Sequence, residues 1–510
     1  MRSETKASSC FNVLLYLESL QRSVKYLRRK VLRLNPDCDC RYGTKGPMSS
    51  FKRFLISAAL LMLASTATVA QQQPESTKAP AGSGDAAIRA AVNEASKSRL
   101  ENTIQKLVSF QTRNTLSVVL PAESGKGAAA AREWIRSEFD RISKECGGCL
   151  EVKLDLFTEP QAERIPQPTE IGNVYAVLRG TDLVNAKRMY LVSGHYDSRA
   201  SDVRDFAAAS PGANDDGSGV AVVLEAARVM SKMKFPATVI FLAVAGEEQG
   251  LNGSRHFAKM AKAEGWNLEA VLNNDIVGGD RSPEQDTTVV RVFSEGIPLA
   301  ASPQELRMIR ATGTENDSAS RQLARYMVET GREYLPKGGF HPEMIFRSDR
   351  FLRGGDQTSF NEQGFAAVRL TDYRENYNHQ HQNPRTENGI EYGDLPKFMN
   401  FDYLANVARI DIATLASLAS APAPPAQVRI LTKTLENGST LTWEPSPGGL
   451  ANHYEVLWRA TTSPTWDNVK NVGDVRQTTL PVSKDNVIFA VRAVDAKGHR
   501  SLPIVPAPER

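Results

Sequence analysis

Residues 189–197, MYLVSGHYD, form an apolar run that ends in a histidine and an aspartate. The same arrangement returns in TVIFLAVAGEE, residues 238–248, and in AVLNNDIVGG, residues 270–279, where apolar runs of strand length end in acidic side chains. Residues 219–233 and 253–265, which follow the first two runs, have the apolar spacing of helices. Near-continuous apolar strands that alternate with helices predict an α/β fold in three layers, with a mostly parallel sheet covered on both faces.

The α/β pattern extends over residues 86–418, and the chain changes character after it. A Pro/Ala-rich linker, residues 419–426, precedes residues 427–510, where apolar and polar residues alternate between turn signals. This alternation is typical of a small all-β sandwich. The run LTW at 441–443 and the alternating strands after it resemble a fibronectin type III module. The resemblance implies that Trp443 packs in the core of this tail.

The formal net charge of +4 over 510 residues is unevenly distributed. Residues 1–70 carry twelve lysines and arginines against four acidic residues, which leaves 50 against 54 for the rest of the chain. Residues 48–70, MSSFKRFLISAALLMLASTATVA, have the basic start, short apolar core and small final residues of a secretory signal peptide. We therefore expect a periplasmic or secreted protein, with no nucleic acid as partner and no stable membrane span after signal removal.

The segment before this signal needs its own interpretation, because signal peptides act from the N-terminus. We interpret residues 1–47 as a non-native extension, with a basic amphipathic helix on a membrane surface as the alternative. Residues 71–85 form a Gln/Pro/Ser/Gly-rich linker. Beyond the leader only Cys146 and Cys149 remain. In an exported protein this pair predicts a local structural disulfide, whereas in a reducing cytosol it would indicate redox or metal chemistry.

Polar clusters follow the apolar runs. Each cluster has a structural explanation of its own, since NDDG is a turn and helix-cap signal and carboxylates favour the first turn of a helix. Together, however, the clusters bring several carboxylates to the edge where parallel strands end, and like charges there repel one another. Divalent cations would neutralise this edge, and mixed histidine and carboxylate ligands suit zinc. The clusters contain His195, Asp197, Asp215, Asp216, Glu247, Glu248 and Asp275.

The motifs GHYDS, NDDGSG, GEEQGLNGS and NDIVG, in this order and spacing, resemble the secreted aminopeptidases with a co-catalytic pair of zinc ions, of the bacterial leucyl aminopeptidase and aminopeptidase Y type. The similarity covers residues 85–418 and implies a zinc-exopeptidase domain that acts on the N-termini of peptides or proteins. It also implies two Zn²⁺ ions per chain and a water that bridges them. The implied ligands are His195 and Asp275 for one ion, Asp215 between the two, and Glu248 with a late histidine for the other. Asp197 would orient His195, and Glu247 would be the general base.

The late histidine lies in YNHQHQ, residues 377–382, which offers His379 and His381. We predict His381 as the ligand, because its spacing from the following TEN segment fits the family better. The family has a tyrosine directly before this ligand, and neither histidine here follows one. Tyr373 or Tyr377 is therefore the candidate oxyanion donor.

Two further acidic residues are predicted to have structural roles. Asp216, next to the bridging ligand, would cap the following helix through its side chain. Asp356 stands where the family has an acidic residue, although Gln357 replaces the histidine that usually follows it. We expect Asp356 to support the site.

Other enzyme classes lack their signatures in this chain. No G-x-S-x-G nucleophile elbow and no HExxH motif occurs in the sequence. On the same fold, a carboxypeptidase or a glutaminyl cyclase is the alternative, and Arg347, Arg350 and Arg353 keep open a cationic site for a substrate carboxylate. A catalytically silent adhesion or binding protein, which would use the tail to bind a surface or polymer, is the alternative from another class. The retention of every acidic ligand argues against it.

Overall fold

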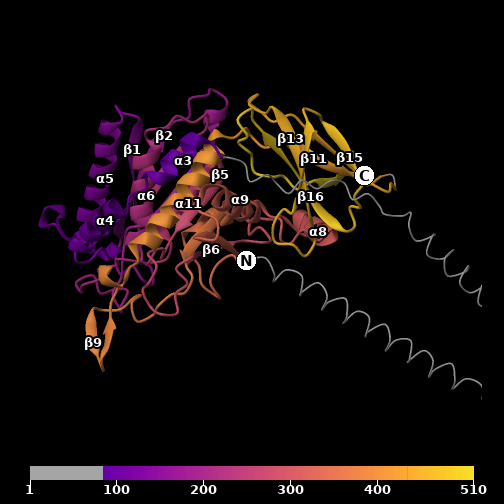
Figure 1. Cartoon of the computed structure of the whole chain (residues 1–510). Helices are drawn as coiled ribbons and strands as arrows, with labels where there is room; N and C mark the ends of the chain where they lie inside the picture. The colour runs from indigo at the N-terminus through magenta and orange to yellow at the C-terminus, as the bar shows by residue number, and fades with distance from the viewer. Residues whose placement is uncertain (1–83, 434, 510) are drawn as a thin grey trace, which may run out of the picture. The chain divides into compact units, whose positions relative to one another are not determined.

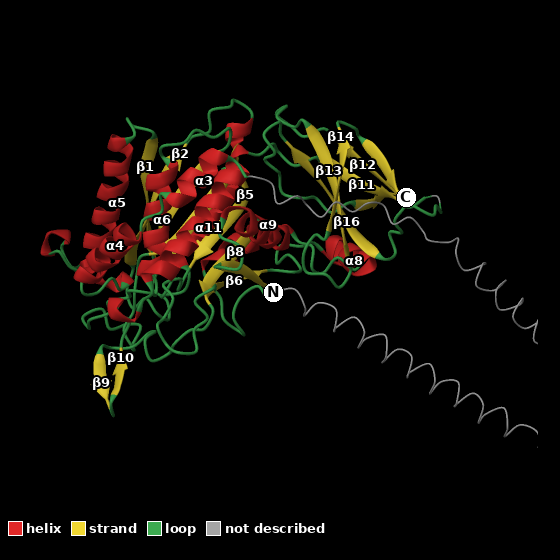
Figure 2. Cartoon of the chain, viewed as in Figure 1, coloured by secondary structure: helices red, strands yellow, loops and turns green. Residues whose placement is uncertain are grey.

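The computed structural model describes residues 84–433 and 435–509. The central sheet of the α/β part contains β1 (Leu150–Glu159), β2 (Thr169–Leu178), β3 (Arg188–His195), β4 (Thr238–Val244), β5 (Asn267–Asn274), β6 (Val289–Ser294), β7 (His341–Ile345) and β8 (Ala367–Asp372). Their order is β1-β2-β4-β3-β5-β8-β6-β7 (Figures 1 and 2). The four central strands β4, β3, β5 and β8 are parallel to one another, while β2 pairs antiparallel with β4 and β6 pairs antiparallel with β8. The predicted α/β class with a mostly parallel sheet is confirmed.

The central strands are rich in apolar residues because both of their faces are covered. Phe241 and Ala243 of β4 pack into one hydrophobic core, whereas Ile240 and Leu242 pack into a second core on the opposite face. The first core is built with α3 (Ala86–Asn93), α4 (Lys97–Ser109), α5 (Gly127–Glu145), α6 (Gly217–Met230), α9 (Ala319–Tyr334) and α11 (Phe401–Ser420). The second is built with α7 (Asn252–Ala263) and α10 (Asp356–Glu362). A further helix, α8 (Pro303–Thr312), has no buried residues.

Long connections follow the later strands. Residues 373–400 lead from β8 to α11 and contain the small exposed hairpin of β9 (Arg385–Glu387) and β10 (Ile390–Tyr392), which projects from the body in Figure 2. Because this connection starts at the carboxyl end of β8, it brings residues far along the chain to the edge where β3, β4 and β5 also end.

The tail folds into two small sheets that pack face to face. One has the order β15-β12-β11-β17 and the other β14-β13-β16. Trp443, Tyr454 and Val456 lie in the hydrophobic core between them, so the predicted burial of the tryptophan is confirmed. The likeness to a fibronectin type III module stays a prediction from the sequence pattern. The strands are β11 (Ala426–Leu431), β12 (Ser439–Glu444), β13 (His453–Ala460), β14 (Asn468–Gly473), β15 (Gln477–Leu480), β16 (Val487–Val494) and β17 (Ala507–Glu509).

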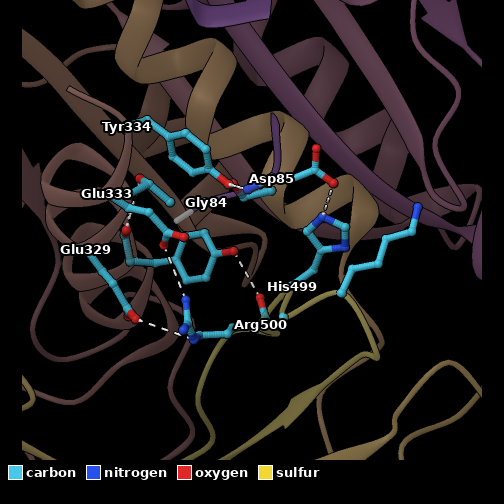
Figure 3. Close-up of a pocket in the computed structure, with 12 residues that line it drawn as sticks. Gly84, Asp85, Glu329, Glu333, Tyr334, His499 and Arg500 are labelled. Carbon is cyan, nitrogen blue, oxygen red and sulfur yellow. Dashed lines mark hydrogen bonds and ion pairs between the residues drawn. The ribbon is translucent and has the colours of Figure 1, made fainter. Parts of the chain in front are cut away.

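Helix α9 and the start of α3 contact the β-sandwich through polar side chains. A cavity of about 130 Å³ lies at this contact. Figure 3 shows residues that line it, among them Asp85, Glu333, His499 and Arg500. His499 Nε2 of the tail lies 3.1 Å from Asp85 Oδ2, the residue that caps α3. Arg500 Nη1 lies 3.2 Å from Glu333 Oε2 on α9. The tail is therefore joined to the α/β part by ion pairs as well as by the linker.

Several predictions concern the termini and the cysteines. The extension at 1–47 and the signal peptide at 48–70 lie outside the described residues. A search of the described helices finds none with the length and apolar character required to cross a membrane. Cys146 and Cys149 form the predicted disulfide between α5 and β1, which is confirmed.

Candidate active site

Three neighbouring parallel strands deliver the predicted site residues to one edge of the sheet. His195 is the last residue of β3, and Asp275 directly follows β5. Glu247 and Glu248 lie in the turn after β4, and Asp215 lies just before α6. Since β3 lies between β4 and β5, these side chains meet where the three strands end.

The side chains form two trios that could each hold a metal ion. In each trio the candidate ligand atoms lie within 4.8 Å of one another. Asp215 connects the trios: its Oδ1 is 3.2 Å from His195 Nε2, and its Oδ2 is 2.9 Å from His381 Nε2. The trios are His195, Glu247 and Asp275, and Asp215, Glu248 and His381.

The spacing of these atoms suits zinc. His381 Nε2 lies 3.1 Å from Glu248 Oε1, and His195 Nε2 lies 3.8 Å from Asp275 Oδ1. Ligand atoms placed tetrahedrally around zinc at normal bond lengths are about 3.3 Å apart. Both His195 Nε2 and Glu248 Oε1 are buried and have no hydrogen-bond partner within the described residues, as expected of atoms that serve a cation. The residues present therefore fit zinc.

The electrostatics of the cluster also call for positive charge. Burial alone would lower the pKa of His195, but the nearby carboxylates of Asp197, Asp215 and Asp275 raise it well above its usual range. For His381, the carboxylates of Glu248 and Asp215 likewise outweigh burial and raise the pKa to about 10. Without another cation, the histidines themselves neutralise these carboxylates. Metal ions at the same positions would take over that role.

Glu247 differs from the other carboxylates. Burial raises its pKa well above the usual range, and the charges of Glu248 and Asp275 raise it further, against the opposing effect of His195. A carboxyl group in this environment holds a proton more readily than an exposed glutamate.

Asp197 contacts the site differently from the prediction. The hydrogen bond of His195 Nδ1 goes to the backbone oxygen of Asp197 at 3.1 Å, and the nearest carboxylate oxygen is 3.5 Å away. The carboxylate instead accepts hydrogen bonds from the backbone N–H groups of Glu247 and Glu248, at 3.2 and 3.1 Å, and from Thr115 Oγ1 at 2.9 Å. Asp197 thus holds both the imidazole and the turn that carries the two glutamates.

Asp216 lies beside the cluster in a structural role. It is the N-cap of α6, and its Oδ1 accepts a hydrogen bond from the Gly219 N–H at 2.8 Å. Its other oxygen accepts from the His195 backbone N–H at 2.9 Å. The predicted helix cap is confirmed, and the same side chain also connects α6 to the end of β3.

The two late histidines are clearly separated. His379 Nδ1 pairs with Asp280, and its ring stacks on Phe398 with centroids 3.7 Å apart. His381 has a φ of 54° and presents Nε2 to Asp215 and Glu248. A positive φ is uncommon outside glycine and is here tied to a residue that points into the cluster. The geometry thus favours His381.

The tyrosines and arginines near the site are less directly engaged. Tyr377 accepts a hydrogen bond from Arg353 Nη1 at 3.4 Å, and both Tyr373 and Tyr377 are largely exposed, so the oxyanion donor stays a prediction. Glu375 Oε2 lies 3.1 Å from Arg350 and 2.7 Å from Arg353. Both arginines are therefore paired within the chain, with Glu375 as their shared partner. The third, Arg347, lies over the ring of Phe351, 5.2 Å from its centroid.

Asp356 is fully buried at the start of α10. Neither of its carboxylate oxygens has a hydrogen-bond partner in the described part of the chain, and burial raises its pKa to about 7. The charges of His195 and Asp275 act on it, so it lies close to the first trio. Gln357 donates to Asp349 through its Nε2.

Two residues of the site were missed by the sequence analysis. Asp394 accepts hydrogen bonds from the backbone N–H groups of Asn214 and Asp215, at 2.8 and 2.7 Å, and so fixes the bridging aspartate from 179 residues away. Arg369, fully buried in β8, lies with Nη2 2.9 Å from Asp275 Oδ1. The only sequence signal for Arg369 is its position as a charged residue in the otherwise apolar run FAAVRL, residues 365–370.

Comparisons with known proteins agree with this geometry. The family model described as Peptidase family M28 matches residues 173–399, which include both trios. A probable zinc metalloprotease of the fungus Leptosphaeria maculans is 44% identical over 424 residues, which cover 82% of this chain and 97% of that protein. The chain belongs to peptidase family M28. It is accordingly a zinc metallopeptidase, and the predicted enzyme class is confirmed.

Further likenesses extend to other fungi and to solved structures. A probable zinc metalloprotease of Pyrenophora teres f. teres is also 44% identical, over 83% of this chain and 87% of that protein. The LapA aminopeptidase of Legionella pneumophila is similar at 20% identity with a TM-score of 0.47, over 65% of this M28 chain and 74% of that one. A glutaminyl cyclase of Macrostomum lignano is similar at 16% identity with a TM-score of 0.46, over 65% and 92%.

Proposed function

We propose that this M28 peptidase is an exported aminopeptidase that holds two Zn²⁺ ions and removes the N-terminal residue of peptides or proteins. The observation that carries the proposal is the position of Asp215, whose two carboxylate oxygens face one histidine of each trio. A carboxylate in this position can be shared by two ions. Each trio then completes one of the two metal positions.

Each residue of the cluster has a role in peptide hydrolysis. Zinc ions at the two trios would supply Lewis-acid activation of the water and of the scissile carbonyl. Glu247 takes the proton of the attacking water and passes it to the leaving amine nitrogen, while the adjacent Glu248 serves as a ligand. Asp197 fixes this division of labour, because its carboxylate holds the backbone of both glutamates.

The charge of the cleft favours a substrate with a free α-amine. Asp356 adds a buried, unpartnered carboxylate close to His195 and Asp275, which suits an ammonium group. A carboxypeptidase would need a cation for the substrate carboxylate, yet Arg350 and Arg353 are both paired with Glu375. The charges support the aminopeptidase over the carboxypeptidase.

Export is supported by two features of the chain. The signal-like segment at 48–70 precedes the peptidase, and Cys146 and Cys149 form a disulfide, a bond typical of oxidising compartments. Expression of the full gene with detection of the mature N-terminus tests this part. Cleavage after Ala70 is expected, and retention of the intact leader in the cytoplasm would contradict it.

The proposed activity is tested with aminoacyl-p-nitroanilides and their N-acetylated counterparts, with and without a chelator. We expect hydrolysis of the free amino substrates only, abolished by the chelator and restored by zinc. Equal hydrolysis of N-acetylated substrates would refute the aminopeptidase assignment. Cyclisation of N-terminal glutamine without hydrolysis would indicate a glutaminyl cyclase instead, and binding without turnover would indicate a silent protein.

A further inference from the structure

A buried arginine on the neighbouring strand β8 contacts Asp275 of the first trio. Arg369 lies on β8, opposite Asn273 of the neighbouring strand β5. Asn273 comes two residues before Asp275 in the sequence. Its Nη2 is 2.9 Å from Asp275 Oδ1, and its Nη1 is 3.6 Å from Asp349 Oδ2. The side chain is fully buried, so solvent does not screen its charge.

Arg369 and the metal position compete for the same atom. Asp275 Oδ1 lies 3.8 Å from His195 Nε2, and the same oxygen pairs with Arg369 Nη2 at 2.9 Å. A cation held by His195 and Asp275 must share this oxygen with the guanidinium group or use Oδ2 alone. In either case a fixed positive charge near a buried cation position lowers the affinity of that position for the ion.

Among the described residues, the second trio has no arginine in direct contact with its carboxylates, because the nearby buried Arg113 donates to backbone oxygens such as that of Gly212, at 2.7 Å. Over residues 84–433 and 435–509, no lysine or arginine forms an ion pair with Asp215 or Glu248, whose ion-pair partners are the two histidines. Asp215 Oδ2 also accepts a hydrogen bond from the uncharged Gln380 Nε2, at 3.0 Å. Nor does Asp349 cancel the charge of Arg369, because it is shared with Arg350, whose Nε lies 2.9 Å from Asp349 Oδ1. The positive charge of Arg369 therefore acts mainly on one side of the site.

We propose that Arg369 makes the two metal positions unequal, so that zinc is held more weakly at the position of His195 and Asp275 than at the position of Glu248 and His381. The inference rests on the proposed two-metal site. It assigns a regulatory consequence to that site: falling zinc empties the first position while the second stays loaded. Arg369 is a positioning residue, because it lowers zinc affinity through its contact with Asp275.

Zinc affinity, measured without any substrate, tests the proposal. A His381→Ala variant of the full chain removes a ligand of the second position, so that competition with a fluorescent zinc chelator reports on the first. In this background Arg369→Met should tighten zinc binding at least tenfold, because the competing cation is gone. Asp349→Asn should weaken binding, because Arg369 then pairs with Asp275 alone. Arg321→Met is the matched control, since Arg321 is equally buried and donates to the backbone oxygen of Ser294.

We expect zinc affinity to rise in Arg369→Met and to fall in Asp349→Asn. If Arg369 had only a structural role, both substitutions would weaken zinc binding. The proposal is overturned if both variants shift the affinity in the same direction, or if Arg369→Met leaves it unchanged. If Arg369→Met does not fold by circular dichroism, Asp349→Asn decides alone, and unchanged or tighter binding there overturns the proposal. Failure of the two-metal function is seen separately, as fewer than two zinc ions bound by the unmodified chain at saturating zinc.

Discussion

One buried carboxylate at the contact between α9 and the β-sandwich pairs with an arginine from each side. Asp317, just before α9, lies with Oδ1 and Oδ2 each 2.8 Å from Arg459 Nη2 of the tail, and its Oδ1 lies 3.1 Å from Arg325 Nη1. The side chains of Asp317, Arg325 and Arg459 are only 1%, 2% and 3% exposed. Asp317→Asn would leave two buried guanidinium groups without a counter-charge. Breaking one buried pair costs about 3–5 kcal/mol, so we expect a loss of at least that size in the free energy of unfolding.

Urea unfolding followed by tryptophan fluorescence measures this loss. Trp466 is a local reporter, because its Nε1 donates to Gln322 Oε1 at the same contact. Asp474→Asn is the matched control: its pair with Arg476 is 63% and 42% exposed, and exposed pairs contribute at most about 1 kcal/mol. If the free energy of unfolding of Asp317→Asn lies within about 1 kcal/mol of that of this control, the buried charges do not hold the tail in place, and the reasoning is wrong.

Three further outcomes follow from the site and the tail. Glu247→Gln should lower kcat by about 10²–10⁴-fold while zinc content by atomic absorption stays the same, and a loss of zinc would show that Glu247 is mainly a ligand. His381→Ala should lose one zinc ion in equilibrium dialysis whereas His379→Ala keeps both, and the reverse result would reassign the ligand. Burial lowers the pKa of His499, but its pairs with Asp495 and Asp85 raise it above the unfolded value. Its stabilising effect is therefore complete below the unfolded pKa of about 6.5 and is lost as pH rises through the folded pKa. His499→Gln should remove this part of the pH dependence of Tm, and an unchanged profile would contradict it.

The sheet and most of the site could be predicted because they depend on local pattern. The strands before His195, Glu247 and Asp275 each contain an apolar run, and the parallel arrangement then brings their ends together. Once the strands are placed, His195, Glu247, Glu248 and Asp275 come together because they stand at or directly after the strand ends.

The residues that were missed depend on contacts between distant segments. Asp394 reaches the backbone of Asp215 only because the connection after β8 folds back over the edge of the sheet. Helix α9 was not foreseen either, because buried Arg321 and Arg325 resemble the residues of a solvent-exposed face. Arg325 is buried because its Nε donates to the Pro464 backbone oxygen of the tail, a contact that no local pattern encodes.

The central claim is that this M28 peptidase cuts only at a free N-terminus through a zinc-dependent site. Mass spectrometry of one peptide, offered with a free and with an acetylated N-terminus, tests it most directly. We predict that the zinc-loaded chain shortens the free peptide by one N-terminal residue at a time and leaves the acetylated peptide intact. Internal fragments, loss of C-terminal residues or equal digestion of the acetylated peptide would contradict the account.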